Sequence, residues 1–176
     1  MCQVWIDASC RLIADVADHS VSEEEEALSV PTGTDADAPV RAHHEIDIDA
    51  PLRAVWQLHT DVNSWPAWQT EITAAHLDGP FQPGASFEWT SYGFTVVSTI
   101  YAVSEGARVL WGGTSGGITG VHEWLFSETP TGVHVSTEES FAGGPVEADV
   151  TGMQSALDSS LAAWLVHLKD AAEAQG

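Results

Sequence analysis

Residues 151–174 read TGMQSALDSSLAAWLVHLKDAAEA, and this stretch decides what the rest of the chain must build. Its apolar side chains recur at intervals of three and four residues, which predicts one long amphipathic helix with an apolar stripe along one side. Thr151 and Gln154 have the spacing of a capping box at its start. The stripe consists of Met153, Leu157, Leu161, Trp164, Leu165 and Leu168. A stripe of this length has to be buried against another layer, so the sequence before it should contain a sheet.

Strand-like runs fill the centre of the chain, and each is followed by turn residues such as Pro83-Gly84 or Tyr92-Gly93. This alternation is typical of an antiparallel meander. The expected strands lie near residues 70–77, 86–91, 94–103, 108–113, 117–127 and 133–141.

Two short helices are expected between a first strand and this meander. Residues 44–48 alternate polar and apolar side chains, and Pro51 then begins a helix in which Leu52, Val55, Trp56 and His59 share a face. A second helical turn follows at Trp65. The sequence therefore predicts an α+β domain, in which a curved antiparallel sheet of about six to seven strands grips the C-terminal helix around an apolar pocket.

The first 39 residues differ in composition from the rest. They contain nine acidic residues and one basic residue, and residues 31–39 are rich in Pro, Gly, Thr and Asp, which is typical of a linker. We expect residues 1–39 to be an acidic N-terminal extension with a linker, and residues 40–176 to be the domain. The extension is either an appendage that packs on the domain or a partner, or a variable addition without a role.

Charge excludes several classes of function. The chain has 26 acidic and 5 basic residues and a net charge of -21, so it repels nucleic acids and anionic lipid head groups. Self-repulsion at this density is relieved by salt, which predicts a salt-requiring protein of a halophile with an acidic proteome; an ordinary acidic protein is the alternative. No secretory signal or long apolar run is present, which predicts a cytoplasmic protein without membrane insertion.

No cofactor or metal is expected. The only two cysteines are Cys2 and Cys10, no histidine has metal-ligand spacing, and no glycine-rich phosphate loop or nucleophile elbow is present. Hydride, phosphoryl and acyl-enzyme chemistry therefore lack their residues.

Side chains two apart on a strand share a face, which allows a pocket wall to be assigned. The inward sets include Phe94, Val96, Ser98 and Ile100 on one strand, and His122, Trp124 and Phe126 on another. The expected ligand-binding residues are Trp89, Val96, Ser98, Trp111, Trp124, Thr137, Met153, Leu157 and Leu161. The tryptophans could equally be packed core, since indole rings this dense usually form one cluster.

His122 and Glu139 are the candidate catalytic residues, because they lie on consecutive strands and share the inward face. A carboxylate near an imidazole raises the histidine pKa and fixes its tautomer, which suits acid–base catalysis assisted by Ser98. The alternative is an isolated polar pair that satisfies its own hydrogen bonds.

The order of elements and several short motifs resemble the START-like helix-grip superfamily (SRPBCC), and within it the polyketide cyclase/dehydrase family. The matching stretches are Ile48-Asp49-Ala50-Pro51, Val55-Trp56, Thr60-Asp61, Trp65-Pro66-Ala67-Trp68, Phe87-Glu88-Trp89, Ser98-Thr99-Ile100, Leu110-Trp111, His122-Glu123-Trp124, Phe126, Thr137-Glu138-Glu139-Ser140 and the terminal helix from Met153 to Lys169. The resemblance covers residues 42–173 and implies a cavity for lipids, aromatic polyketides, hormones or quinones.

Three functions follow from these observations. The first is binding of a hydrophobic small molecule, either a lipid or an aromatic or polyketide-like compound, between sheet and terminal helix. The second is a polyketide cyclase or dehydratase that works by acid–base catalysis. The third is a regulatory partner protein that docks through its acidic N-terminal segment. The sequence leaves the ligand and the oligomeric state open.

Overall fold

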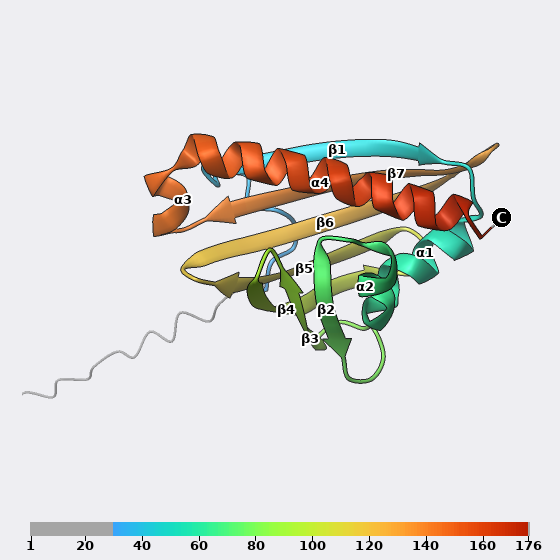
Figure 1. Ribbon diagram of the computed structural model, residues 1–176, viewed down its shortest axis with the longest axis horizontal. Helices are drawn as coiled ribbons and strands as arrows, with labels where there is room; N and C mark the ends of the chain where they lie inside the picture. Colours follow the sequence, from blue (N-terminus) through green and yellow to red (C-terminus); the bar gives the residue numbers. More distant parts are fainter. Residues whose placement is uncertain (1–29, 176) are drawn as a thin grey trace, which may run out of the picture.

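The structure is a computed structural model that describes residues 30–175. The expectations for residues 1–29, including both cysteines and the acidic run, lie outside the described residues. Seven strands form one antiparallel sheet in the order β1-β7-β6-β5-β4-β3-β2 (Figure 1). Their bounds are β1 Val40–Ile48, β2 Ile72–Leu77, β3 Ser86–Ser91, β4 Phe94–Ser104, β5 Arg108–Ser115, β6 Ile118–Thr129 and β7 Gly132–Ala142.

The helices lie on one side of this sheet. The long α4 (Val150–Glu173) runs beside β1 and β7, and α3 (Gly144–Ala148) precedes it at one end, as Figure 1 shows. Between β1 and β2 lie α1 (Leu52–Thr60), a single 3-10 turn (Val62–Ser64) and α2 (Trp65–Trp68). The predicted α+β helix-grip arrangement is confirmed, with the short helix α3 as an addition.

The start of α4 differs from the predicted capping box. The N-cap is Asp149, whose Oδ1 accepts a hydrogen bond from the Gly152 backbone N–H at 2.9 Å. Thr151 is already inside the helix, and the side chain of Gln154 instead bonds the backbone of Arg41 on β1. Asp149 caps in its place because its carboxylate lies three residues before a free N–H, which is the geometry that an N-cap needs.

Strand register places the predicted inward sets on the face toward α4. His122 pairs with Glu139 and Trp111, Trp124 pairs with Thr137, and all of these except Glu139 are buried. Strand β4 has a register shift between Ile100 and Ala102, so Val103 rather than Ala102 continues its core side. Phe94 also begins this inward row but is 72% exposed, because β4 extends beyond the part of the sheet that the helices cover.

The two ends of the sheet are built differently. We call the end with the turns at residues 92–93 and 116–117 and with α3 the hairpin end; the opposite end, with α1 and the C-terminus of α4, is the α1 end. The larger hydrophobic cluster, with Trp65, Trp111, Trp124 and Trp164, fills the middle and the α1 end. A smaller cluster of Val40, Ala42, Val146, Leu157 and Leu161 joins the start of α4 to β1.

Residues 30–38 lie against the outer face of the sheet, opposite α4. The backbone N–H of Asp35 donates to Ser140 Oγ at 3.0 Å, and Arg108 Nη2 donates to the carbonyl of Thr32 at 2.7 Å. Thr34 hydrogen-bonds to Glu138. The stretch that composition marks as a linker therefore has specific contacts along its described part.

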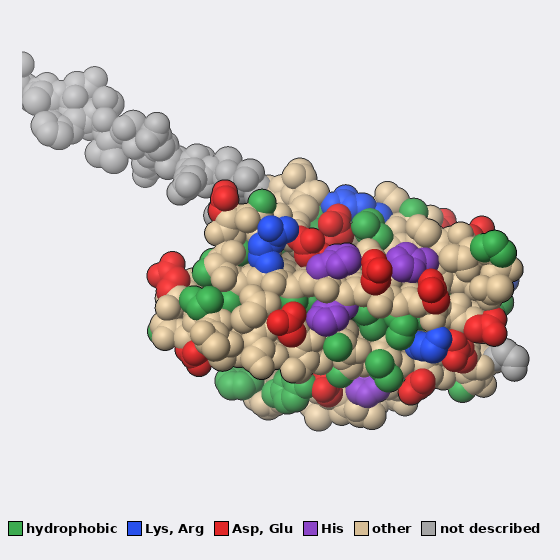
Figure 2. Space-filling model, turned by 90° about the horizontal axis from the view of Figure 1, so that it is seen from above, with side chains coloured by type: hydrophobic (Ala, Val, Ile, Leu, Met, Phe, Trp, Pro, Cys, Tyr) green, Lys and Arg blue, Asp and Glu red, His purple; other side chains and the backbone are tan. Residues whose placement is uncertain are grey.

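The surface is mixed in character. Figure 2 shows acidic side chains scattered over the face seen from above, with few basic ones among them. Within residues 30–175, no helix has the length and the apolar composition required to span a membrane.

Candidate functional site

Four tryptophans close the interior between the sheet and α4. Trp65 from α2, Trp111 from β5, Trp124 from β6 and Trp164 from α4 are each at most 4% exposed. The Trp65 and Trp164 rings meet edge to face with centroids 5.4 Å apart, and Trp124 lies 5.7 Å from Trp164. Such contacts add stability beyond the burial of area. This part of the interior is therefore packed core.

Two histidines are sealed among these rings. His59 on α1 lies 4.5 Å from Trp124 and His122 on β6 lies 4.9 Å from the same ring, both between ring centroids. Burial lowers the pKa of His59 to about 3, since a charged imidazole loses its water there. Burial, and then the proximity of His59, lowers the pKa of His122 well below its ordinary value. Both imidazoles are neutral near pH 7.

The tautomer of His122 follows from its neighbours. Thr137 Oγ1 donates its proton to the carbonyl of Glu123 at 3.0 Å, so it accepts from His122 Nε2 at 2.7 Å. With the proton on Nε2, the Nδ1 atom is an acceptor. Glu139 Oε2 lies 3.5 Å from that Nδ1. Burial raises the pKa of Glu139 to about 8, so near pH 7 the carboxyl group mostly keeps its proton. At this separation the two groups form no hydrogen bond, and His122 Nδ1 has no partner within the described residues.

The structure thus brings His122 and Glu139 together but reverses the expected electrostatics. The sequence argument expected a carboxylate that raises the histidine pKa; instead, desolvation dominates and both groups are neutral. Ser98 does not join them, because its hydroxyl oxygen accepts a hydrogen bond from the indole N–H of Trp89 at 3.0 Å. Glu139, with 12% of its side chain exposed, is the member of the pair that solvent reaches.

The inward face opens toward the hairpin end. Trp89, Val96 and Phe141 face inward there but are only half-buried. Between them β5 and β6 pair through Gly113 and Gly120, which present no side chain. A Cβ on Gly120 would meet the ring of Phe141 at 3.2 Å and Glu139 Oε1 at 3.4 Å, so an added side chain would press against the two residues that line this region. We call the region lined by Trp89, Val96, Gly113, Gly120, Glu139, Phe141 and Met153 the open end.

The predicted ligand-binding residues divide between two environments. Trp111, Trp124, Ser98, Thr137, Leu157 and Leu161 are at most 2% exposed and belong to the packed interior. Trp89, Val96 and Met153 are half-buried and lie at the open end.

Two residues of this region, Gly113 and Gly120, were missed in the sequence analysis. His59 was placed on the shared face of the expected helix without a role, and it does share the buried face of α1 with Val55. The only signal for Gly113 and Gly120 was their position in the inward-facing rows of two strands. They were not assigned to the pocket wall because glycine has no side chain.

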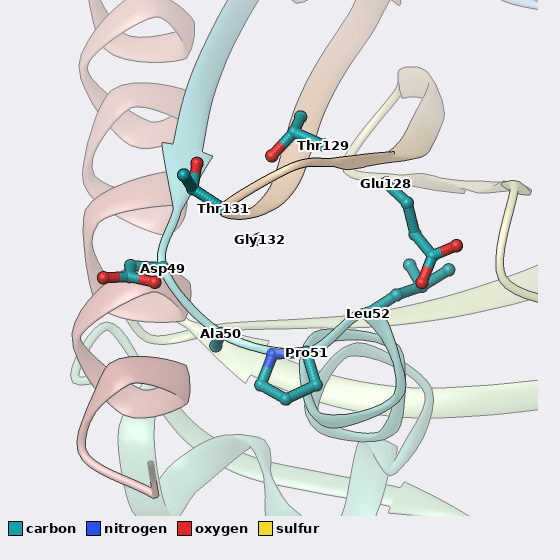
Figure 3. A pocket seen from close by; sticks show the side chains of 8 residues that line it. All are labelled: Asp49, Ala50, Pro51, Leu52, Glu128, Thr129, Thr131 and Gly132. Atoms are coloured by element: carbon teal, nitrogen blue, oxygen red, sulfur yellow. The ribbon is translucent and has the colours of Figure 1, made fainter.

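Two distinct pockets lie elsewhere. One, of about 360 Å³, is at the α1 end between the β1–α1 connection and the β6–β7 turn, lined by Asp49, Pro51, Leu52, Glu128 and Gly132 among others (Figure 3). The other, of about 590 Å³, lies on the outer face between residues 30–35 and β6 and β7. Neither contains the His122–Glu139 pair. Within the described residues no group of three or more His, Cys, Asp or Glu could hold a metal ion.

Comparison with protein families assigns most of the chain to one family. Residues 39–173 match the family described as polyketide cyclase / dehydrase and lipid transport. The chain belongs to this family. The match includes every strand and helix from β1 to α4. No curated protein matches the chain in sequence.

Solved structures show the same fold at low identity. A hypothetical protein from Helicobacter pylori, jhp0584, superposes with a TM-score of 0.69 and 19% identity, over 78% of this chain and 90% of that one. The di-domain ARO/CYC protein StfQ from the steffimycin biosynthetic pathway gives 0.64 and 12%, over 77% of this chain and 52% of that one. BexL, the di-domain ARO/CYC from the BE-7585A pathway, gives 0.63 and 19%, over 76% and 50%. The chain therefore spans about half the length of these di-domain proteins.

Proposed function

We propose that this protein binds a hydrophobic small molecule at the open end, between the sheet and the first half of α4. The proposal rests on how solvent exposure changes along the inward face of the sheet. Trp111 and His122 are buried, whereas the residues nearer the hairpin end are half-buried: Val96, Gly113 and Gly120. Apolar side chains that face the interior and stay partly exposed offer a binding surface for apolar molecules. Membership in a family described by cyclase, dehydrase and lipid transport supports the same proposal.

The chemistry of the wall favours an uncharged ligand. Val96, Phe141, Met153 and the ring of Trp89 supply apolar contact, and the protonated Glu139 supplies one hydrogen-bond donor. Among the described side chains that line the open end, none is Lys or Arg. An anionic group would therefore lose its water without gaining a countercharge.

Gly120→Val tests the site, with Nile red as an uncharged fluorescent probe. The valine side chain would enter the open end, and a methyl-scale change in an apolar pocket alters affinity about tenfold or more, so we expect at least that loss. Thr119→Val is the matched control, because Thr119 is the adjacent residue and faces the outer side. If Gly120→Val keeps parental affinity while its melting temperature shows that it is folded, the ligand does not bind there. Gly120→Ala is the milder variant if the valine disturbs folding.

Acid–base catalysis by a cyclase or dehydratase is the second candidate, and one observation favours it. Glu139 is a carboxylic acid whose pKa is raised to about 8, and its Oε2 lies 3.5 Å from Nδ1 of the neutral His122. A group poised near neutral pH can give a proton to a substrate oxygen and take one back from the substrate or from water, which reaches the exposed 12% of its side chain. Glu139→Gln keeps the shape and removes the proton; it should abolish turnover of a polyketide substrate while the binding of Nile red persists. Turnover that survives this change would exclude Glu139 as the acid.

The net charge of -21 bears on the solution conditions in which the protein is stable. We propose that the protein requires salt, as halophile proteins do, because screening weakens repulsion among its carboxylates. The melting temperature should rise from low to molar salt, and a flat response would exclude this.

The cytoplasmic location and the regulatory role of residues 1–39 stay predictions. Loss of a partner on deletion of residues 1–29 would support the regulatory role.

A further inference from the structure

The hairpin end of the sheet is built from two long stretches without a charged residue. Residues 89–104 lie between Glu88 and Glu105, and residues 109–122 lie between Arg108 and Glu123. They form the end of β3, all of β4, nearly all of β5, and the start of β6. The two hairpins touch, since Ser115 Oγ donates to the carbonyl of Thr95 at 3.2 Å. In so acidic a chain, two adjacent hairpins that carry no acidic residue over these stretches form a distinct surface.

The β3–β4 hairpin also exposes large apolar side chains. Phe94 is 72% exposed, Tyr92 64% and Val97 54%. Other exposed apolar side chains, such as Leu125 on β6 and Val166 on α4, lie on separate elements. We call Tyr92, Phe94 and Val97 the aromatic tip.

Tyr92 stands at a position where turn geometry disfavours it. Tyr92 and Gly93 have φ of 49° and 81°, and two-residue turns of this kind prefer Asn or Gly at the first position. A bulky side chain in the left-handed region is strained. The turn therefore holds an aromatic ring in solvent despite a backbone that Asn would suit better, which points to a contact for that ring.

We propose that the aromatic tip docks on a zwitterionic lipid surface such as phosphatidylcholine, with Tyr92 and Phe94 entering the head-group region. Tyr suits this position because its ring is apolar and its hydroxyl is polar, as in the aromatic belts of membrane proteins. Its hydroxyl is hydrogen-bonded to Glu71, which keeps the polar end of the side chain toward β2. Docking on a surface goes beyond ligand binding in the interior and does not depend on it.

The same observations disfavour a second copy of this chain as the occupant. Stable dimers bury on the order of 1,200 Å² or more, and three side chains on a narrow hairpin supply a small part of that. Two copies of net charge -21 also repel each other. Glu71 and Glu147 flank the hairpin end, so an anionic lipid surface would be repelled and an uncharged one would not.

The test is co-flotation of the full chain with vesicles of pure phosphatidylcholine, and with vesicles that also contain phosphatidylserine. We expect binding to the pure vesicles and weaker binding to the anionic ones, with the difference reduced by salt. Phe94→Ser should lower the partition coefficient about tenfold, because a buried aromatic side chain contributes about that much. Tyr92→Asn should lower it as well, although Asn relieves the backbone strain. Val166→Ser is the matched control, since Val166 is exposed on α4, and it should leave binding unchanged.

Three outcomes would overturn the proposal. The first is a parent chain that floats with neither vesicle. The second is a folded Phe94→Ser variant that binds like the parent. The third is a parent chain that ignores vesicles but forms a dimer in sedimentation, with the dimer lost in Phe94→Ser, which would assign the tip to a second copy. The Nile red titration separates this result from ligand binding, since Phe94→Ser can abolish flotation while Gly120→Val alone removes the interior site.

Discussion

The middle and α1 end of the interior is filled by Trp65, Trp111, Trp124 and Trp164, whereas the hairpin end is bounded by Gly113, Gly120 and half-buried side chains. The sheet and α4 border both regions, but α1 and α2 also cover the packed one, so the difference arises from helix coverage as well as from side-chain volume. Large rings make the covered part of the interior solid core. At the hairpin end Gly120 adds no side chain beside Phe141 and Glu139, and Gly113 adds none because a Cβ there would collide with the Val97 carbonyl. A family that shares a backbone can thus vary where its interior is open.

The contrast between the two regions predicts that Trp124→Ala lowers the free energy of unfolding much more than Val96→Ala does. Trp124 is fully buried, so its truncation should lower the free energy of unfolding by about 3–5 kcal/mol. Val96 faces the same interior but is half-buried, and its truncation should cost about 1 kcal/mol or less. Chemical denaturation measures both values. Similar losses would mean that the two regions are packed alike.

Glu139→Gln tests whether Glu139, between the packed interior and the open end, makes the stability of the fold depend on pH. The pKa of Glu139 is raised by burial to about 8, so the folded chain holds a proton that the unfolded chain has released, and stability is lost as pH rises from 4.5 toward 8. Gln has no proton to lose. The parent should lose about 2–3 kcal/mol more than the variant between pH 6 and pH 8, given 1.4 kcal/mol for each unit. Parallel pH profiles would place Glu139 in water.

The sequence predicted the architecture well and the interior poorly, for one reason. Strand and helix periods report which side a residue faces, and the inward rows through His122, Trp124 and Thr137 were assigned correctly in this way. Periodicity does not report how far along the strand the covering helix reaches, so Phe94 was placed inside. It also assigns no role to glycine, which hid Gly113 and Gly120. The helix cap at Asp149 was missed because Thr151 offered a matching spacing two residues later.

The direction of the pKa shifts could not be predicted from sequence either. Adjacency of His122 and Glu139 was visible from strand order, and their separation of 3.5 Å agrees with it. Desolvation depends on everything that packs around the pair, including His59 from α1 and Trp164 from α4. Those neighbours come from distant segments that strand alternation does not connect.

His59→Leu tests how much the buried His59 contributes to the loss of stability at acidic pH. The pKa of His59 is lowered to about 3, so the folded chain binds fewer protons than the unfolded chain, and stability falls as pH drops below about 6.5. Between pH 6.5 and pH 5 this histidine should account for about 2 kcal/mol of the loss. Both ring nitrogens of His59 lack a hydrogen-bond partner within the described structure, so Leu should not weaken the fold at pH 7. Thermal unfolding at both pH values tests this; an unchanged acid slope would mean that His59 takes up protons in the folded state.

Asp149→Ala should give the smallest effect and confine it to the hairpin end. Asp149 caps α4 where the helix leaves the open end, and loss of an N-cap costs about 1 kcal/mol. Hydrogen exchange should quicken at the backbone N–H of Gly152 while that of Leu165 stays protected, because Leu165 lies among the packed tryptophans. Asp149→Asn is the control, since its side-chain oxygen still accepts the Gly152 bond. If exchange quickens equally along α4, the helix opens as one unit, and the open and sealed regions are not independent in stability.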